Sequence, residues 1–129
     1  MTKIIFNSER YFTVYDYNLS HGQLLIRSDK RKGYDNNIDI LFFDTQYIQI
    51  FNMLDGITIK LSDKTVSNIK YESVSSYLKY EDNNLFEIES GGISYFIAAS
   101  FVKIYENRLE HFESSIEMHE KGNLIGSSI

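Results

Sequence analysis

The chain has 129 residues, no cysteine, proline or tryptophan, and a formal net charge of −5 at neutral pH. This length is typical of about one domain with its own hydrophobic core, and a hydrophobic content of 43% with 15% aromatic residues excludes a disordered chain. The lack of cysteine excludes disulfide bonds, thiolate metal sites and a cysteine nucleophile, and the negative charge argues against general affinity for nucleic acid or anionic lipid, because such binding depends on cations that neutralise phosphates.

The first ten residues, MTKIIFNSER, lack the cationic segment and long apolar run of a secretory signal. No later stretch approaches the roughly 20 consecutive apolar residues that a membrane span requires. We therefore expect a cytoplasmic protein that does not interact with a membrane.

Short strand-like segments alternate along the chain with clusters of Gly, Asn, Asp and Ser, from which turns are built when proline is absent. Ten tyrosines and nine phenylalanines also favour β-sheet over a helical bundle. This spacing predicts a mainly β protein, an antiparallel sandwich or barrel of about seven or eight strands. The predicted segments are residues 11–19, 23–28, 37–51, 56–61, 69–80, 85–89 and 93–105.

The central segment, residues 37–51, reads NIDILFFDTQYIQIF. Apolar residues alternate along its first half, and the polar triplet at residues 44–46 then interrupts the pattern. Either one strand carries a solvated notch at this triplet, or two shorter strands meet at a tight turn. We expect the turn, because strands usually last about five or six residues and Asp is depleted inside them.

The later segments differ in their apolar patterns. Residues 56–61 alternate cleanly, which predicts a strand with one solvated face, whereas residues 93–105 are apolar on both faces and predict a covered strand. The Ser-Gly-Gly sequence at residues 90–92 predicts a hairpin that pairs residues 85–89 with the start of the covered strand. Residues 69–80 fit a helical spacing as well as an interrupted strand, and their Ser, Tyr and Val content favours the strand.

The end of the chain predicts one amphipathic helix over residues 108–121. Asn107 and Glu110 have the spacing of a capping box, and apolar residues follow at i, i+3 and i+7. Gly122 stands where a left-handed residue ends many helices. We expect this helix to lie over the sheet and residues 123–129 to form a flexible tail.

These elements predict a single β-rich domain over residues 1–122. Its architecture of antiparallel strands closed by a C-terminal helix resembles pleckstrin-homology-like domains at the level of fold, from which function does not follow. The sequences HGQLLIRS (residues 21–28) and NIDILFF (residues 37–43) resemble paired segments of a family of small uncharacterised bacterial proteins. That resemblance implies a bacterial source but no activity and no site.

His21 and Arg27 are candidate ligand-binding residues, because in an extended strand they would share one face. A guanidinium can bind an anionic group as a bidentate fork, and a histidine titrates near neutral pH. The alternative is that His21 is an ordinary turn residue and that Arg27 pairs across the sheet with Asp39 or Asp44.

No pattern in the sequence predicts catalysis, a metal site or a cofactor. His111 and His119 would lie roughly 12 Å apart along the predicted helix, which is too far for one metal. The chain has no Gly-rich phosphate loop, no G-x-S-x-G elbow and no H-E-x-x-H motif. A binding protein is therefore expected in preference to an enzyme.

Within that class we expect a module that binds a protein partner through exposed tyrosines, since tyrosine is enriched at interfaces and acidic groups speed encounter with basic partners. Small size, acidity and the lack of a catalytic pattern suggest an immunity or antitoxin-like protein that neutralises a basic toxin. One alternative is a β-barrel that binds a small molecule or anion beside His21 or Arg27. Another is a structural protein that self-associates through an unpaired strand. The predicted interface residues are Tyr15, Tyr17, Tyr34 and Tyr47.

Overall fold

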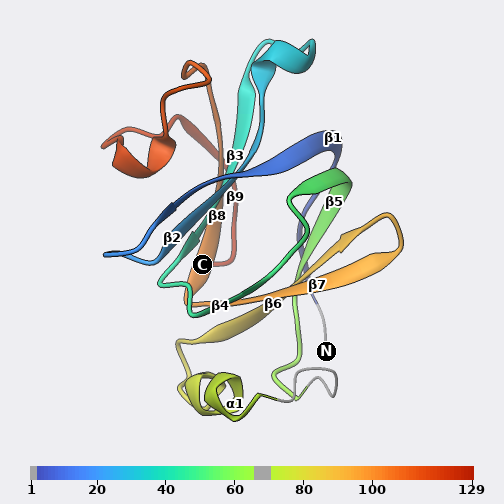
Figure 1. Ribbon diagram of the computed structural model, residues 1–129, viewed down its shortest axis with the longest axis vertical. Coiled ribbons are helices and arrows are strands. Elements are labelled where there is room, and N and C mark those ends of the chain that lie inside the picture. The colour runs from blue at the N-terminus through green and yellow to red at the C-terminus, as the bar shows by residue number, and fades with distance from the viewer. Residues whose placement is uncertain (1–2, 66–70) are drawn as a thin grey trace.

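The computed structural model describes residues 3–65 and 71–129. In these residues nine strands form one sheet in which every pairing is antiparallel, in the order β4-β7-β6-β5-β1-β2-β3-β8-β9 (Figure 1). The mainly β, antiparallel prediction is confirmed; the sheet is not closed, so the sandwich or barrel is not confirmed. The strands are β1 (Lys3–Asn18), β2 (Gln23–Ser28), β3 (Asn37–Phe43), β4 (Tyr47–Gln49), β5 (Met53–Leu61), β6 (Asn84–Ser90), β7 (Ile93–Ala99), β8 (Phe101–Asn107) and β9 (Asn123–Ser127). The helical elements are α1 (Glu72–Leu78) and the short 3-10 turns η1 (Lys30–Lys32) and η2 (Ser115–Glu117).

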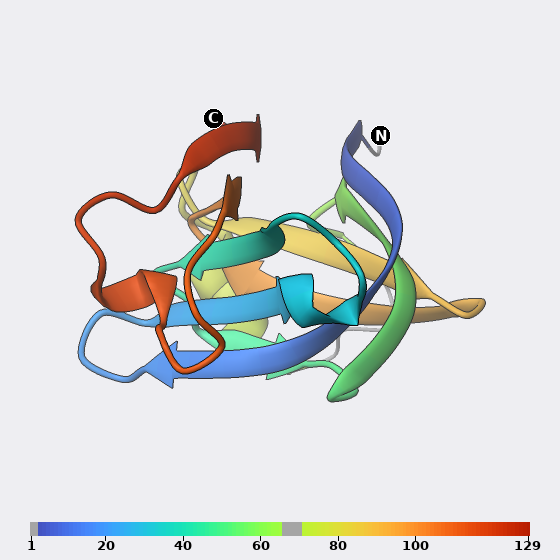
Figure 2. The same cartoon turned by 90° about the horizontal axis from the view of Figure 1, so that it is seen from above.

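The long strand β1 connects the two parts of the sheet. Its pairing with β5 runs from Lys3 to Thr13, and its pairing with β2 begins at Thr13. Register shifts interrupt both pairings, and such bulges bend a strand and increase its twist. The sheet therefore curls strongly, as Figure 2 shows.

The curled sheet surrounds one main hydrophobic cluster. Every strand except the edge strands β4 and β9 contributes fully buried side chains to it. At its centre the rings of Phe42 and Phe86 meet edge to face, with centroids 5.5 Å apart. The predicted pairing of residues 85–89 with the start of residues 93–105 is confirmed, because β6 and β7 form this hairpin.

The central segment, residues 37–51, is divided at Asp44 into β3 and β4, which do not pair with each other. Opposite this break, residues 93–105 are divided at Ser100 into β7 and β8, where a single strand was predicted. Ser100 N–H donates to the Phe43 carbonyl at 2.9 Å, and Gln46 N–H donates to the Ala98 carbonyl at 2.9 Å. The two segments therefore remain side by side through a shared bend, and the break is not a hairpin turn.

The prediction of a strand over residues 69–80 is wrong where the structure describes these residues, since Glu72–Leu78 form α1. Residues 69 and 70 lie outside the described part of the chain. Val74 and Leu78 are one helical turn apart and pack together on β6 and β7. This buried i, i+4 stripe is the physical reason for a helix, and it places α1 on the outer face of the sheet.

The prediction of a helix over residues 108–121 is also wrong. Residues 108–122, the C-terminal segment, lack α-helix and contain only the turn η2, and Phe112 of the predicted apolar stripe is 75% exposed. Ile116 instead packs on Leu25 and Leu41, on the outer face of β2 and β3. The predicted flexible tail, residues 123–129, contains β9, which pairs with β8.

A buried ion pair lies beneath the C-terminal segment. The side chains of Arg27 and Asp39 are 1% and 0% exposed, and Nε and Nη2 of Arg27 donate to the carboxylate at 2.6 and 2.9 Å. Asn107 Nδ2 donates to Asp39 at 2.9 Å and to the Lys121 carbonyl at 2.9 Å. Asn37 Nδ2 donates to the Asn107 side chain at 2.9 Å. This network joins the sheet to the segment that covers it, since a buried charge requires such partners.

We expect Arg27→Ala to lower the free energy of unfolding by about 3–5 kcal/mol, because it leaves Asp39 buried without its counter-charge. Arg31→Ala is the matched control: Arg31 is paired with Asp29 but its side chain is 60% exposed, so the loss should stay below about 1 kcal/mol. Urea unfolding followed by circular dichroism measures both. Equal losses in the two variants would contradict a structural role of the buried pair.

Candidate functional site

The sheet has two edge strands, β4 and β9, and they differ in the room beside them. Cα atoms of β9 approach those of β1 to within 8 Å. An added strand needs about 9.6 Å between its two neighbours, twice the usual strand spacing, so it does not fit where these two strands approach. In the described part of the chain, β4 pairs with β7 alone. The free edge with room beside it is therefore that of β4.

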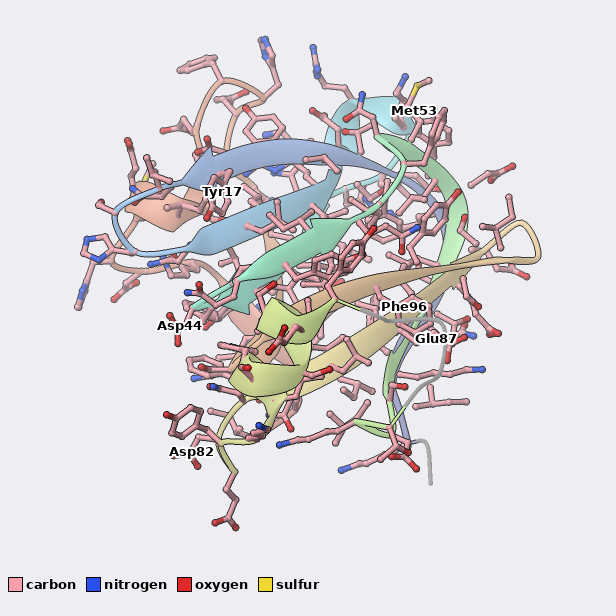
Figure 3. All side chains as sticks on the ribbon, turned by 60° about the horizontal axis from the view of Figure 1, so that its bottom comes forward. Tyr17, Asp44, Met53, Asp82, Glu87 and Phe96 are labelled. Atoms are coloured by element: carbon pink, nitrogen blue, oxygen red, sulfur yellow. The ribbon has the colours of Figure 1, made fainter. Side chains whose placement is uncertain are left out.

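Residues 47–53, here called the β4 edge, comprise β4, the connection after it and the first residue of β5. In the described part of the chain they combine the unpaired side of β4 with exposed apolar side chains. Ala98 faces β4, because its carbonyl accepts from Gln46 N–H. Its partner Tyr47, and Gln49 two residues on, therefore face β7 with their main-chain groups, whereas those of Ile48 between them point away from β7. The side chains of Ile48, Phe51 and Met53 are 41%, 58% and 49% exposed. Figure 3 shows Asp44 and Met53 on either side of β4, with α1 below it. An exposed apolar strand edge is a template for pairing with another chain.

A small pocket opens between β4 and α1. It has a volume of about 140 Å³ and lies on the outer face of the sheet. The hydroxyl of Tyr77 on α1 donates to the Asp44 carbonyl at 3.1 Å, which holds the helix against the bend before β4. The ring centroids of Tyr47 and Tyr71 are 5.7 Å apart. The pocket is lined by Gln46, Tyr47, Ser73, Val74, Tyr77 and Ala98.

Asp44 gives the pocket a charged neighbour. Its φ of 55° is left-handed, a conformation that Asp and Asn adopt more readily than other side chains. Its exposed carboxylate accepts hydrogen bonds from Ser100 Oγ at 3.0 Å and from Gln46 Nε2 at 3.5 Å. In the next residue Thr45 N–H donates to the Gly22 carbonyl at 2.8 Å. Gly22 has a φ of 59°, and a Cβ there would lie 3.0 Å from Thr45 N, so the turn before β2 can pack on this bend only with glycine.

The pocket tyrosines are neutral phenols at physiological pH. Burial raises the pKa of Tyr47, and the nearby Tyr71 adds to this shift. Burial also raises the pKa of Tyr77, a hydrogen bond with Ser100 opposes the shift, and the negative charge of Asp44 adds to it. Both hydroxyl groups can therefore donate and accept hydrogen bonds at the pocket.

The structure does not bring the predicted ligand residues together. His21 is exposed in the turn before β2. Arg27 lies near the other end of β2, beneath the C-terminal segment, with its guanidinium engaged by Asp39. The predicted alternative, an Arg27 paired across the sheet with Asp39, is the arrangement observed.

The four predicted interface tyrosines lie in different environments. Tyr15 packs under Arg27, whose Cζ is 4.3 Å from the ring centroid, and Tyr34 packs under Arg10 at 3.7 Å. Tyr17 is 40% exposed in β1. Of the four, only Tyr47 lines the pocket. The pocket residues of α1 were missed because residues 69–80 were predicted as a strand, although their helical spacing was visible.

A second hollow lies beside β9 and the end of the C-terminal segment. It is about 370 Å³ in volume and is lined by Tyr105 and residues 119–123. Lys121 Nζ beside it donates to three carbonyls of the C-terminal segment, at 2.6, 2.9 and 3.2 Å. Burial lowers the pKa of Lys121, and the charge of Asp39 opposes the shift. The ammonium group of Lys121 therefore holds the C-terminal segment in place and is not free to bind a ligand. For this reason we regard the β4 edge, and not the second hollow, as the stronger candidate site.

In residues 3–65 and 71–129 no helix is long and apolar enough to cross a bilayer. In the same residues no three His, Cys, Asp or Glu side chains group together as metal ligands.

We expect Tyr77→Phe to lower the free energy of unfolding by about 0.5–1.5 kcal/mol, the usual value of one hydrogen bond, because it removes the bond to the Asp44 carbonyl. Tyr80→Phe is the control, since Tyr80 is 71% exposed and should tolerate the change. Urea unfolding measures both variants.

The same pair of variants should differ at alkaline pH. The pKa of Tyr77 is raised above 10.0 in the folded protein, so the folded state retains this proton more firmly than the unfolded state. The resulting stability is present below pH 10.0 and is lost as the pH rises through the raised pKa. Tyr77→Phe should therefore reduce the loss of stability above that pH. An alkaline profile identical to that of the wild type would contradict this role.

Comparisons with known proteins give no match. No protein-family model, curated protein sequence or solved structure matches the chain. The resemblance of residues 21–28 and 37–43 to small bacterial proteins stays a prediction, and the function of the β4 edge must be inferred from its geometry and chemistry.

Proposed function

We propose that the protein is a small cytoplasmic binding module that receives an extended segment of a protein partner as an added strand along the β4 edge. The observation that carries this proposal is an unpaired, apolar strand edge next to a pocket of about 140 Å³. In strand addition, main-chain hydrogen bonds supply affinity and pockets for alternate side chains supply specificity. The β4 edge offers both parts.

The side chains around this edge suit a protein partner. Phe51, Tyr47 and Met53 are of types enriched at interfaces, where a few large anchors carry most of the binding free energy. The net charge of −5 would speed encounter with a basic partner. Neutralisation of a basic toxin, as in an immunity or antitoxin-like protein, is the narrower form of this proposal.

The pocket fits the alternative of a small-molecule barrel less well. Its volume of about 140 Å³ is below the roughly 300–1,000 Å³ of common ligand sites. The space enclosed by the sheet is filled by the main hydrophobic cluster. Self-association would use the same edge, with a second copy as the partner.

We expect Phe51→Lys to weaken binding of the natural partner by roughly tenfold or more, because it removes an aromatic anchor and places a charge on the edge. The control is Leu124→Lys, which places the same charge on the other edge strand at a side chain that is 54% exposed. Quantitative pull-down from the source cells identifies partners that the wild type and the control retain and Phe51→Lys loses. Titration with the purified partner then gives the dissociation constants.

Hydrogen exchange with the purified partner should show new protection of the Ile48 amide, which points to the open side of β4. Light scattering over a concentration series tests the self-associating form, in which the dimer would be lost in Phe51→Lys. Equal binding by both lysine variants, or protection confined to β9, would contradict the proposed site.

A further inference from the structure

We infer that the pocket between β4 and α1 receives a cationic side chain, a lysine or arginine of the partner's added strand. This inference rests on the proposed function and specifies the chemistry of the partner. It depends on the size of the pocket, the nature of its walls and the charge of the neighbouring Asp44.

The pocket has room for one side chain. Its volume of about 140 Å³ is close to that of an engineered cavity of about 150 Å³ that binds benzene. Because it lies beside a strand that can accept a neighbour, a residue of an added strand can reach it without a change in backbone direction.

The walls suit a side chain with an apolar stem and a polar end. Val74 and Ala98 supply apolar surface that can pack against methylene groups. The rings of Tyr47 and Tyr77 supply faces that attract cations. The remaining lining side chains, Gln46 and Ser73, carry oxygen atoms that can accept hydrogen bonds. A wholly apolar occupant would leave these polar groups without partners.

The negative charge of Asp44, close enough to the pocket to act on Tyr77 and bonded to Gln46, favours a cation. Asp44 is exposed, and among the described residues no Lys or Arg side chain forms an ion pair with it. It is joined to the pocket by its contacts with Tyr77 and Gln46. The two hydrogen bonds that its carboxylate accepts from described residues leave acceptor sites open, because a carboxylate has about four. An anionic occupant would face this carboxylate, whereas an ammonium or guanidinium group would be attracted to it.

The test uses three small probes of similar length, n-butylammonium, n-butanol and butyrate, titrated into ¹⁵N-labelled protein. We expect n-butylammonium to shift the amide resonances of Tyr47, Val74 and Tyr77 at lower concentration than the other two probes. Asp44→Asn keeps the size of the side chain and its tolerance of a left-handed backbone. It should weaken n-butylammonium binding roughly two- to fivefold, as expected for an exposed ion pair.

Asp35→Asn is the matched control for Asp44→Asn. Asp35 is exposed in the turn between η1 and β3, and this turn lies at the opposite end of the molecule from α1 (Figure 1). The control should bind n-butylammonium as the wild type does. Dispersed amide spectra establish that both variants are folded.

Three outcomes would overturn the inference: equal shifts with all three probes, shifts located away from the pocket, or equal n-butylammonium binding by wild type and Asp44→Asn. None of these outcomes depends on the partner. Failure of the proposed function appears elsewhere, as unchanged partner binding by Phe51→Lys, so the two failures can be told apart.

Discussion

The buried ion pair between Arg27 and Asp39 constrains a large part of this structure. Two charges on the outer face of β2 and β3 cannot be removed from water unless each finds close partners. The side-chain amide of Asn107 donates one hydrogen bond to Asp39 and a second to the carbonyl of Lys121. The C-terminal segment is thus required to cover the pair, and its path leads the chain into β9. The covered face and the second edge strand have the same physical origin.

The other constraint is the shared bend at Asp44 and Ser100. It lets the two segments run side by side, paired as β3 with β8 before the bend and as β4 with β7 after it. After the bend β4 continues for only three residues before the chain leaves for β5. The short strand β4 lies at the edge of the sheet. The helix α1 packs close to the bend, so that the Tyr77 hydroxyl donates to the Asp44 carbonyl. The candidate site therefore follows from backbone geometry as much as from its side chains.

The sequence predicted those elements whose stabilising interactions lie within one short stretch of chain, and it failed where these interactions join distant residues. The Ser-Gly-Gly sequence at residues 90–92 predicted the β6–β7 hairpin, because pairing and turn lie within one short stretch. The helix predicted over residues 108–121 does not form because the interaction that decides this segment is distant in sequence. The side chain of Asn107, the predicted helix cap, bonds instead to Asp39, 68 residues away. Gly122 does adopt a left-handed φ of 108°, but at a close approach to the Glu106 carbonyl and not at a helix end. Within the candidate site, Tyr47 and the interruption at residues 44–46 were predicted. The pocket residues that α1 contributes were not predicted.

The contrast between the two outer faces bears on function. Over β2 and β3 the C-terminal segment covers the sheet and satisfies its buried polar groups. Over β6 and β7 the short helix α1 stops at the pocket. Among the described residues no strand pairs with the side of β4 that faces away from β7, and Phe51 and Met53 of the β4 edge are about half exposed. Exposed apolar edges are an aggregation hazard that proteins usually block with lysine, proline or a covering segment. The sequence from Tyr47 to Met53 contains neither lysine nor proline. The C-terminal segment, which could serve as a cover, lies over β2 and β3 instead. An edge that a partner occupies in the cell would need no such protection, and this is the physical reason to seek the function of the protein there.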